Sequence, residues 1–334
     1  MSDCQRRFLC SRFLVFHDHS CWFASPVNLV VSWQEAHTLA WSERRKCIIR
    51  QSAIVTCTLF VVGLVASWIV AGRLVAPQRC VIGDPPADLP ARPISLVSDS
   101  GSTIAGWHVP SDTREGVIVL LHPIRGSRLS MLERARLLYA AGYSIVMIDL
   151  QAHGESPGTH MTIGYLEQHD ARAAVEFARQ QHPNESIGVV GVSLGGASTL
   201  LASPLGIDAL VLESVYPNIN DAVHNRVAAK LGLLSTIPAE LLLVHLKPRL
   251  GISPSQLRPI DHLPNVACPV YLISGTDDHR TTANETKEMF SAARQPKEMW
   301  LVDGAAHEDL YRASAVEYKS RVLTFFNQHM RKLP

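Results

Sequence analysis

Residues 51–72 (QSAIVTCTLFVVGLVASWIVAG) contain no charged side chain, and Arg50 and Arg73 bracket them. As an α-helix this run would be about 33 Å long, against about 30 Å for the hydrocarbon core of a bilayer. A buried core helix is the alternative, but soluble helices rarely contain so long an uninterrupted apolar run. The sequence therefore predicts one transmembrane helix over 51–72.

Basic residues on the two sides of this run predict its orientation. Four of them lie within 44–50, whereas Arg73 and Arg79 follow the run together with Asp84 and Asp88. An excess of Lys and Arg marks the cytoplasmic side of a membrane helix. No small-x-small cleavage site is evident, so the run resembles an uncleaved anchor more than a signal peptide. We expect a single-pass membrane protein whose C-terminal domain is extracytoplasmic.

The segments on either side of the anchor show no helical or strand period. We predict an unstructured tail over 1–50, in which His17, Asp18, His19 and Cys21 do not make a convincing metal site. One hypothesis places the natural start near Arg44, which leaves open whether 1–43 belong to the natural protein. Residues 73–93 are rich in proline, and we expect an extended linker that separates the bilayer from the domain.

Composition narrows the classes of partner. Lys plus Arg number 31 and Asp plus Glu number 30, so the balance gives no reason to expect nucleic acid. The seven cysteines form no C-x-x-C pair, the spacing that zinc and thioredoxin-type sites use. We expect no metal and no organic cofactor.

Residues 94–334 alternate between strand-like and helix-like segments. We predict strands over 94–97, 103–109, 117–121, 144–148, 187–190, 209–213, 270–274 and 298–302. We predict helices over 129–141, 165–181, 195–202, 283–293 and 314–328. This alternation predicts a mostly parallel, doubly wound α/β sheet. The pattern breaks over 216–259, where we expect a pair of short apolar helices that form a lid over the mouth of a site.

The motif GVSLGG, Gly191 to Gly196, follows one predicted strand and opens a helix. It is a G-x-S-x-G nucleophile elbow in the context that the elbow requires. The glycines allow a tight turn in which Ser193 adopts a strained backbone with its hydroxyl exposed. Leu194 directs its backbone N–H toward a developing oxyanion at the helix N-terminus.

A serine hydroxyl needs an imidazole base, and the imidazole needs a carboxylate to hold its tautomer. Asp277 and Asp278 both follow a predicted strand, in ISGTDDHRTT, and both qualify as the acid. His307, in DGAAHEDL, follows the last strand and is the candidate base. The order serine, aspartate, histidine is the one used by folds with this elbow.

The second oxyanion donor is expected in the loop His122-Pro123-Ile124-Arg125-Gly126, which follows the strand VIVLL. Pro123 has no N–H, so Ile124 is the first candidate and Arg125 the second. We interpret His122 as structural.

Residues 95–330 resemble the α/β-hydrolase superfamily, and most of all its serine-aminopeptidase and lysophospholipase-like branch. The segment DLQAHGES, 149–156, is similar to the D-x-R-G-H-G-x-S of that branch, with Gln151 and Ala152 in place of Arg and Gly. In that family the acid lies three residues after a strand-end glycine. Counted from Gly275, this resemblance implies Asp278 rather than Asp277. The usual His-Gly of the oxyanion loop is His-Pro here.

Other polar residues have less specific interpretations. We interpret four histidines as surface or structural residues: His153, His160, His169 and His279. Glu213 and Ser214 end a strand on the same sheet edge as the elbow, where either a pocket-lining or a structural role is open.

Together these features predict hydrolysis of a carboxylic ester or related acyl bond, with Ser193, His307 and Asp278 as the triad. A lid of apolar helices close to a bilayer favours a small-molecule or lipid-like acyl substrate. A serine exopeptidase is a second possibility, and it requires a carboxylate near the pocket to bind a free amine. A third is a non-catalytic, membrane-tethered binding module.

Overall fold

The computed structural model describes residues 33–307 and 309–330, and the chain divides into two compact units, 1–60 and 61–334. In the first unit the described residues form the beginning of helix α2 (Trp33–Leu74). Within Trp41–Leu74, an 18-residue window has a mean hydropathy of 2.4. By length and composition this part of α2 is able to cross a membrane.

Helix α2 begins earlier than the sequence predicts. We expected an unstructured tail up to residue 50, whereas the structure is helical from Trp33 onward. Local pairs one turn apart support the helix, since Lys46 contacts Glu43 at 2.9 Å and Arg45 lies over the Trp41 ring. A helix held by such local pairs needs no periodic pattern of apolar residues. The prediction of an unstructured tail relied on the absence of that pattern. The residue 17–21 cluster lies outside the described residues.

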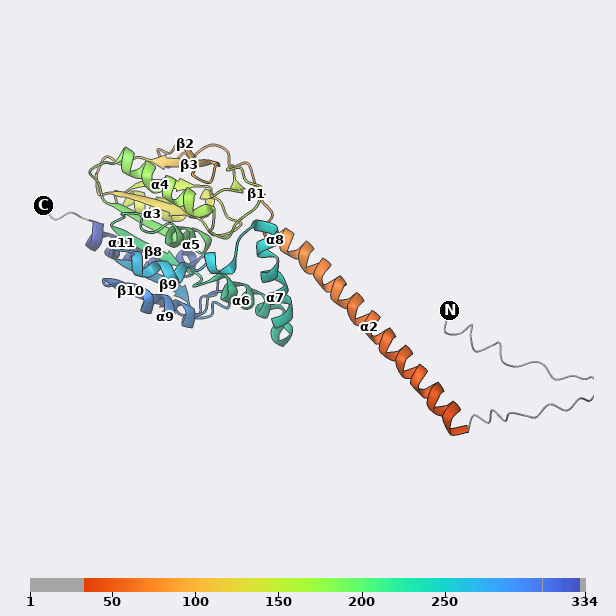
Figure 1. The fold of residues 1–334 in the computed structure, drawn as a ribbon. Helices are drawn as coiled ribbons and strands as arrows, with labels where there is room; N and C mark the ends of the chain where they lie inside the picture. The colour runs from red at the N-terminus through yellow and green to blue at the C-terminus, as the bar shows by residue number, and fades with distance from the viewer. Residues whose placement is uncertain (1–32, 308, 331–334) are drawn as a thin grey trace, which may run out of the picture. The chain divides into compact units, whose positions relative to one another are not determined.

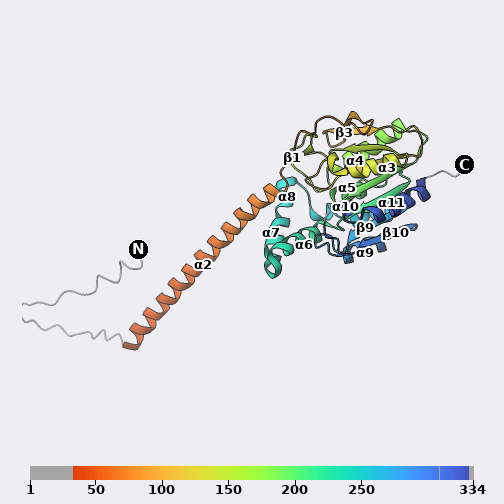
Figure 2. The same ribbon diagram turned by 180° about the vertical axis from the view of Figure 1, so that it is seen from behind.

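The second unit is built on an eight-stranded sheet in the order β10-β9-β8-β7-β4-β5-β3-β2 (Figures 1 and 2). Its strands are β2 (Arg92–Val97), β3 (Thr103–Val109), β4 (Val117–Leu121), β5 (Ser144–Ile148), β7 (Ile187–Val192), β8 (Ala209–Glu213), β9 (Val270–Gly275) and β10 (Lys297–Val302). Only β3 pairs antiparallel with its neighbours β2 and β5, and the other pairs are parallel. The mostly parallel sheet is confirmed.

Helices cover both faces of this sheet. They are η1 (Arg128–Met131), α3 (Leu132–Ala140), α4 (Glu167–Gln181), α5 (Leu194–Leu201), α9 (Ala283–Ala292), α10 (Leu310–Ala313) and α11 (Ala315–Met330). Alternate residues of β4 enter opposite cores: Val119 packs with α4 and α5, whereas Ile118 packs with α3 and α11. A strand buried on both faces needs a continuous apolar run, as VIVLL provides.

The lid insertion lies between β8 and β9, as predicted. It contains α6 (Ile219–Leu231), η2 (Gly232–Leu234), α7 (Thr236–Val244), α8 (Leu246–Leu250), η3 (Pro254–Gln256) and η4 (Pro259–Asn265). The structure thus has three α-helices where the sequence predicted a pair. Their inner faces are buried through Ile219, Leu243 and Leu246.

Residues 73–93 do not form the free, extended linker that the sequence predicts. Helix α2 continues to Leu74, and β1 (Gln78–Arg79) pairs in parallel with β6 (His153–Gly154). The carbonyl of the buried Val75 accepts a hydrogen bond of 2.9 Å from the Met161 amide. The segment therefore lies on the domain. Proline content misled the prediction, because the backbone partners are about 75 residues away in the sequence.

Candidate active site

The turn between β7 and α5 has the geometry of a nucleophile elbow. Ser193 has φ 49° and ψ −106°, a strained conformation for a residue with a side chain. Its amide donates a hydrogen bond of 2.8 Å to the Glu213 carbonyl on the neighbouring strand. A Cβ on Gly195 would lie 2.3 Å from the Leu121 carbonyl oxygen, so this position excludes any larger residue. The glycines of the motif are thus needed for close packing of the turn.

Asp278 and His307 meet at the carboxyl end of β9. The Oδ2 atom of Asp278 lies 2.8 Å from Nδ1 of His307. The Oδ1 atom accepts hydrogen bonds of 2.8 Å from the amides of Arg280 and Thr281. Asp278 is buried, whereas Asp277 is exposed. The structure therefore pairs the imidazole with Asp278 and not with its neighbour.

The charge state of Asp278 follows from these contacts. Burial alone would raise the pKa of this carboxyl, but the hydrogen bond and charge of His307, with the two amides, outweigh it and lower the pKa. An ionised carboxylate accepts a hydrogen bond from the Nδ1–H of His307, which leaves Nε2 without a proton and able to act as the base.

Ser193 belongs to the same carboxyl edge, because β7, β8 and β9 are adjacent parallel strands. The Ser193 side chain is buried. Within residues 33–307 and 309–330, its hydroxyl makes no hydrogen bond, so the structure joins His307 to Asp278 and not to the serine. Catalytic hydrogen bonds commonly tighten only when substrate binds.

The loop after β4 is held by His122. Its Nε2 accepts a hydrogen bond of 3.0 Å from the Leu150 amide, so Nδ1 carries the proton and donates to the Pro123 carbonyl at 2.8 Å. Complete burial, and then the proximity of His153, lower the pKa of His122 to about 3. A neutral imidazole bonded at both nitrogens supports the structural interpretation. Ile124 packs against the core cluster that contains Leu194.

The segment 149–156 is a buried loop that supports this edge. Asp149 accepts hydrogen bonds from the amides of Arg128 at 2.7 Å and Glu155 at 2.9 Å. Gly154 has a positive φ, and a Cβ there would lie 2.2 Å from an Asp149 carboxylate oxygen. His153 is buried with Nδ1 2.9 Å from the Gln151 carbonyl oxygen. Its structural interpretation fits these contacts. His160 and His169 are partly exposed, and His279 is exposed.

An ion cluster that sequence reasoning missed connects the elbow with the His307 loop. Arg134 of α3 donates to both carboxylate oxygens of Glu213, at 2.9 and 2.6 Å, and to Asp309 at 2.8 Å. The Tyr318 hydroxyl also donates to Glu213, at 2.6 Å. Arg134 and Glu213 are buried. Glu213 lies on β8 opposite Val192, the residue before Ser193, and Asp309 comes two residues after His307. The cluster therefore links the strand beside the elbow to the loop that carries His307.

Glu213 is thus structural. Ser214, the next residue, is buried with φ 47°, and its amide donates 2.8 Å to the Ile273 carbonyl. The only hint in the sequence was a glutamate at the end of an otherwise apolar strand. Its partners come from α3 and α11, which are distant in the chain, so no local pattern reveals them.

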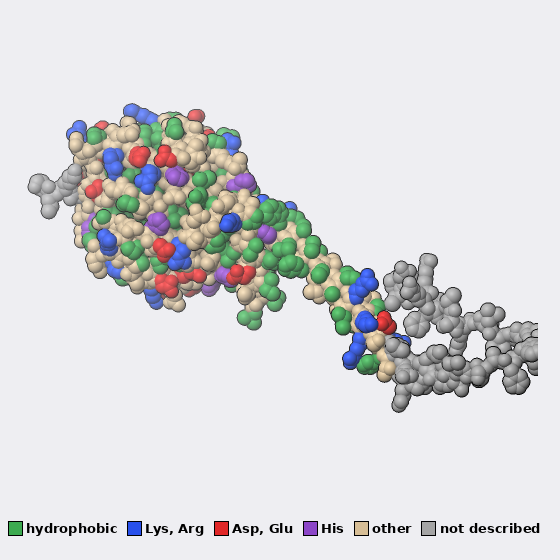
Figure 3. Space-filling model, viewed as in Figure 1, with side chains coloured by type: hydrophobic (Ala, Val, Ile, Leu, Met, Phe, Trp, Pro, Cys, Tyr) green, Lys and Arg blue, Asp and Glu red, His purple; other side chains and the backbone are tan. Residues whose placement is uncertain are grey.

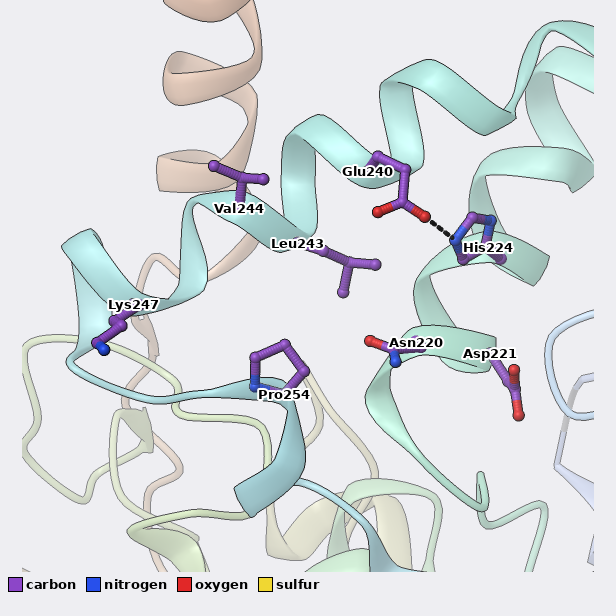
Figure 4. Close-up of a pocket in the computed structure, with 8 residues that line it drawn as sticks. All are labelled: Asn220, Asp221, His224, Glu240, Leu243, Val244, Lys247 and Pro254. Atoms are coloured by element: carbon purple, nitrogen blue, oxygen red, sulfur yellow. Dashed lines mark hydrogen bonds and ion pairs between the residues drawn. The ribbon is translucent and has the colours of Figure 1, made fainter.

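A hollow of about 670 Å³ lies among the lid helices (Figure 4). Residues of α6, α7 and α8 line it, and His224 of α6 contacts Glu240 of α7 at 3.0 Å. None of its lining residues is a predicted triad member. No group of three or more His, Cys, Asp or Glu side chains suited to a metal ion occurs in the described part of the chain.

Comparisons with known proteins show a related family and related folds. A family model described as "Serine aminopeptidase, S33" matches residues 112–262. An uncharacterized protein of Mycobacterium tuberculosis (strain H37Rv) is 28% identical over 265 residues, which cover 75% of this chain and 86% of that protein. The uncharacterized protein YqkD of Bacillus subtilis is 22% identical over 237 residues, covering 70% of this chain and 78% of YqkD.

Among solved structures, the Pyrococcus furiosus esterase Pf2001 is similar with a TM-score of 0.65 and 22% identity, over 77% of this chain and 99% of that one. The Rhodococcus esterase RhEst1 is similar with a TM-score of 0.51 and 18% identity, over 71% and 99%. With the sheet order, these structures show the α/β-hydrolase fold, and the family match over 112–262 supports a place in that superfamily. The family match supports a hydrolase.

Proposed function

We propose that this chain is a membrane-anchored serine hydrolase that cleaves a carboxylic ester or related acyl bond through an acyl-enzyme. The observation that carries the proposal is the 2.8 Å hydrogen bond between His307 and the buried Asp278, at the same sheet edge as the strained elbow of Ser193. A binding module would gain nothing from these three groups together.

The mechanism follows from the roles of these atoms. The Ser193 hydroxyl attacks the acyl carbon while Nε2 of His307 accepts its proton, and Asp278 stabilises the imidazolium that forms. The Leu194 and Ile124 amides hold the oxyanion, helped by the N-terminus of α5. His307 then protonates the leaving alcohol, and a water activated by the same nitrogen releases the acid. Each step uses only groups of this chain and the solvent.

The membrane anchor is proposed from α2, whose apolar part is mostly exposed, apart from Ser67 and Ala71 near its end. The basic residues within 44–50 favour a cytoplasmic N-terminus, so the hydrolase domain would be extracytoplasmic.

Pf2001 and RhEst1 are both named as esterases, which favours an ester substrate here. The serine aminopeptidase description of the matching family favours an exopeptidase as the second candidate. Turnover of a chain-length series of acyl esters, compared with aminoacyl amides on the same preparation, separates the two. Ester turnover that exceeds amide turnover supports our proposal, and the reverse ratio supports the exopeptidase.

The central test is labelling by a fluorophosphonate probe, which reacts with an activated serine. We expect the wild type to be labelled and Ser193→Ala to be unlabelled, with an unchanged circular dichroism spectrum. Ser214→Ala is the matched control, because Ser214 is also buried at this edge with a positive φ, and its hydroxyl has no hydrogen-bond partner among the residues that the structure describes. Retained labelling of Ser193→Ala would reject the assignment.

A further inference from the structure

The lid exposes an apolar segment that we name the lid tip, residues 228–237 (AAKLGLLSTI). It joins the end of α6 to the start of α7. Leu233 is fully exposed, and Leu234 and Ile237 are 79% and 73% exposed. The tip carries one charge, on Lys230, and no acidic residue. In Figure 3 hydrophobic side chains stand out from the domain at this end of α7. So concentrated an apolar surface indicates an interaction site.

We call His245 and Arg249 the root of the lid, because both contact the last turns of α2. Their contacts with α2 lie within the second unit. The Ser67 hydroxyl is 2.8 Å from Nε2 of His245. The Arg249 guanidinium lies 4.0 Å from the centre of the Trp68 ring and donates a hydrogen bond of 2.7 Å to the Trp68 carbonyl. Gly72 leaves room for this arginine, since a Cβ there would lie 3.0 Å from it.

These contacts fix the depth of the lid in a bilayer. The basic residues within 44–50 mark one boundary of the hydrocarbon core. A core of about 30 Å needs about 20 helical residues, so counting from Gln51 it extends to about Val70. Ser67 and Trp68 therefore lie within one helical turn of the second boundary, and so do the lid residues bonded to them. A tryptophan stacked with an arginine is typical of this interfacial region.

We infer that the lid tip is a second membrane-binding element, which inserts its leucines into the leaflet where α2 ends. The inference rests on the anchor in our proposed function. A lipid surface is the occupant because α2 itself holds the root of the lid near the boundary. The exposed cations Lys230 and Lys247 flank α7 and suit anionic headgroups. Substrate would then reach the lid from the leaflet, which favours an acyl lipid.

The test measures immersion of the tip in the full chain, reconstituted in nanodiscs of phosphatidylcholine and phosphatidylglycerol. The buried Cys268 is kept, and the other six cysteines are replaced by serine. These six are Cys4, Cys10, Cys21, Cys47, Cys57 and Cys80. Spin labels are placed singly at Leu234→Cys, at Val62→Cys in α2 (58% exposed) and at Val316→Cys in α11 (87% exposed). Collision rates with oxygen, which partitions into lipid, and with a water-soluble nickel chelate are compared.

We expect the ratio of oxygen to nickel collisions at residue 234 to exceed that at residue 316 by at least about threefold, approaching that at residue 62. A ratio at 234 equal to that at 316, with a lipid-like ratio at 62, overturns the inference and leaves the anchor intact. Water-like ratios at all three positions overturn both.

A low collision rate of residue 234 with nickel that appears only in nanodiscs holding two chains would mean that a second copy covers the lid tip. This outcome also overturns the inference. None of these ratios depends on catalysis. Probe labelling of Ser193 therefore tests the hydrolase assignment separately.

Discussion

The carboxyl edge of the sheet and the lid differ in how their residues are held. At the sheet edge, Asp278 accepts three hydrogen bonds and His122 is bonded at both ring nitrogens. In the lid, three short helices bury a few residues such as Ala239 and expose the tip. The difference teaches that the groups that we propose for catalysis are fixed before substrate arrives, whereas the lid tip is an exposed apolar surface. The predictions below test this division, beginning with the largest expected effect.

Asp278→Asn should reduce kcat by about 10⁴-fold, because the amide can no longer hold the His307 tautomer. Asp277→Asn is the matched control, since Asp277 is the exposed neighbour, and its kcat should stay at the wild-type value. Steady-state hydrolysis of a soluble acyl ester measures both. Equal losses in the two variants would contradict the assignment of Asp278.

Arg134→Met should lower the free energy of unfolding by about 3–5 kcal/mol, because Glu213 would remain buried without its partner. Arg136→Met, on the same helix, breaks only surface ion pairs with Asp88 and Glu133 and should cost less than about 1 kcal/mol. Chemical unfolding of the detergent-solubilised chain measures both. A small cost at Arg134 would show that the cluster does not brace the edge.

His122→Gln should change the pH dependence of stability. Burial depresses the pKa of His122 from 6.5 to about 3, so the unfolded chain binds the proton first as the pH falls. The stabilisation is complete above about pH 6.5 and is lost toward pH 3, by about 1.4 kcal/mol per pH unit. The variant should lack this slope when unfolding is measured between pH 6.5 and 4.5.

Asp170 acts in the opposite direction, so the slope must be compared between the two proteins. Burial raises the pKa of Asp170 to about 7, and its folded form binds the proton first as the pH falls. This group therefore adds stability over the same interval. Identical slopes for His122→Gln and the wild type would contradict a neutral, buried His122.

The double variant Leu233→Ser, Leu234→Ser should leave both stability, within about 0.5 kcal/mol, and turnover of a soluble short-chain ester unchanged. Both side chains are exposed, and neither belongs to the groups that we propose for catalysis. Thermal unfolding and ester turnover measure the two quantities. A large loss of turnover on the soluble ester would mean that the lid tip contributes to the active site and not only to membrane binding. The sheet edge and the lid would then not have separate roles.

The sequence predicts the sheet well because each strand carries its own signal. VIVLL and SIVMI are continuous apolar runs, and the structure places both in the centre of the sheet. The glycines around Ser193 predict the elbow because only glycine fits the backbone contacts there. The catalytic roles of Ser193, His307 and Asp278, and of the Leu194 and Ile124 amides, stay predictions.

Other features have no local signal. Arg134 meets Glu213 across 79 positions of the chain, and only the packing of α3 onto the sheet brings them together. The β1–β6 pair has two residues in each strand, too few to show a period. The part of α2 before residue 50 makes side-chain contacts within single turns, and the search for an apolar stripe passes over these.

The pairing of β1 with β6 has a consequence for how the enzyme meets its substrate. Only residues 75–77 separate the end of α2 from a strand that is fastened to the domain. If α2 spans a bilayer, a tether of this length leaves no freedom to sample bulk solution. The turnover rate per enzyme molecule should then saturate with the number of substrate molecules per unit area of the vesicle. Dilution of vesicles that carry both enzyme and substrate, at fixed composition, should leave this rate unchanged.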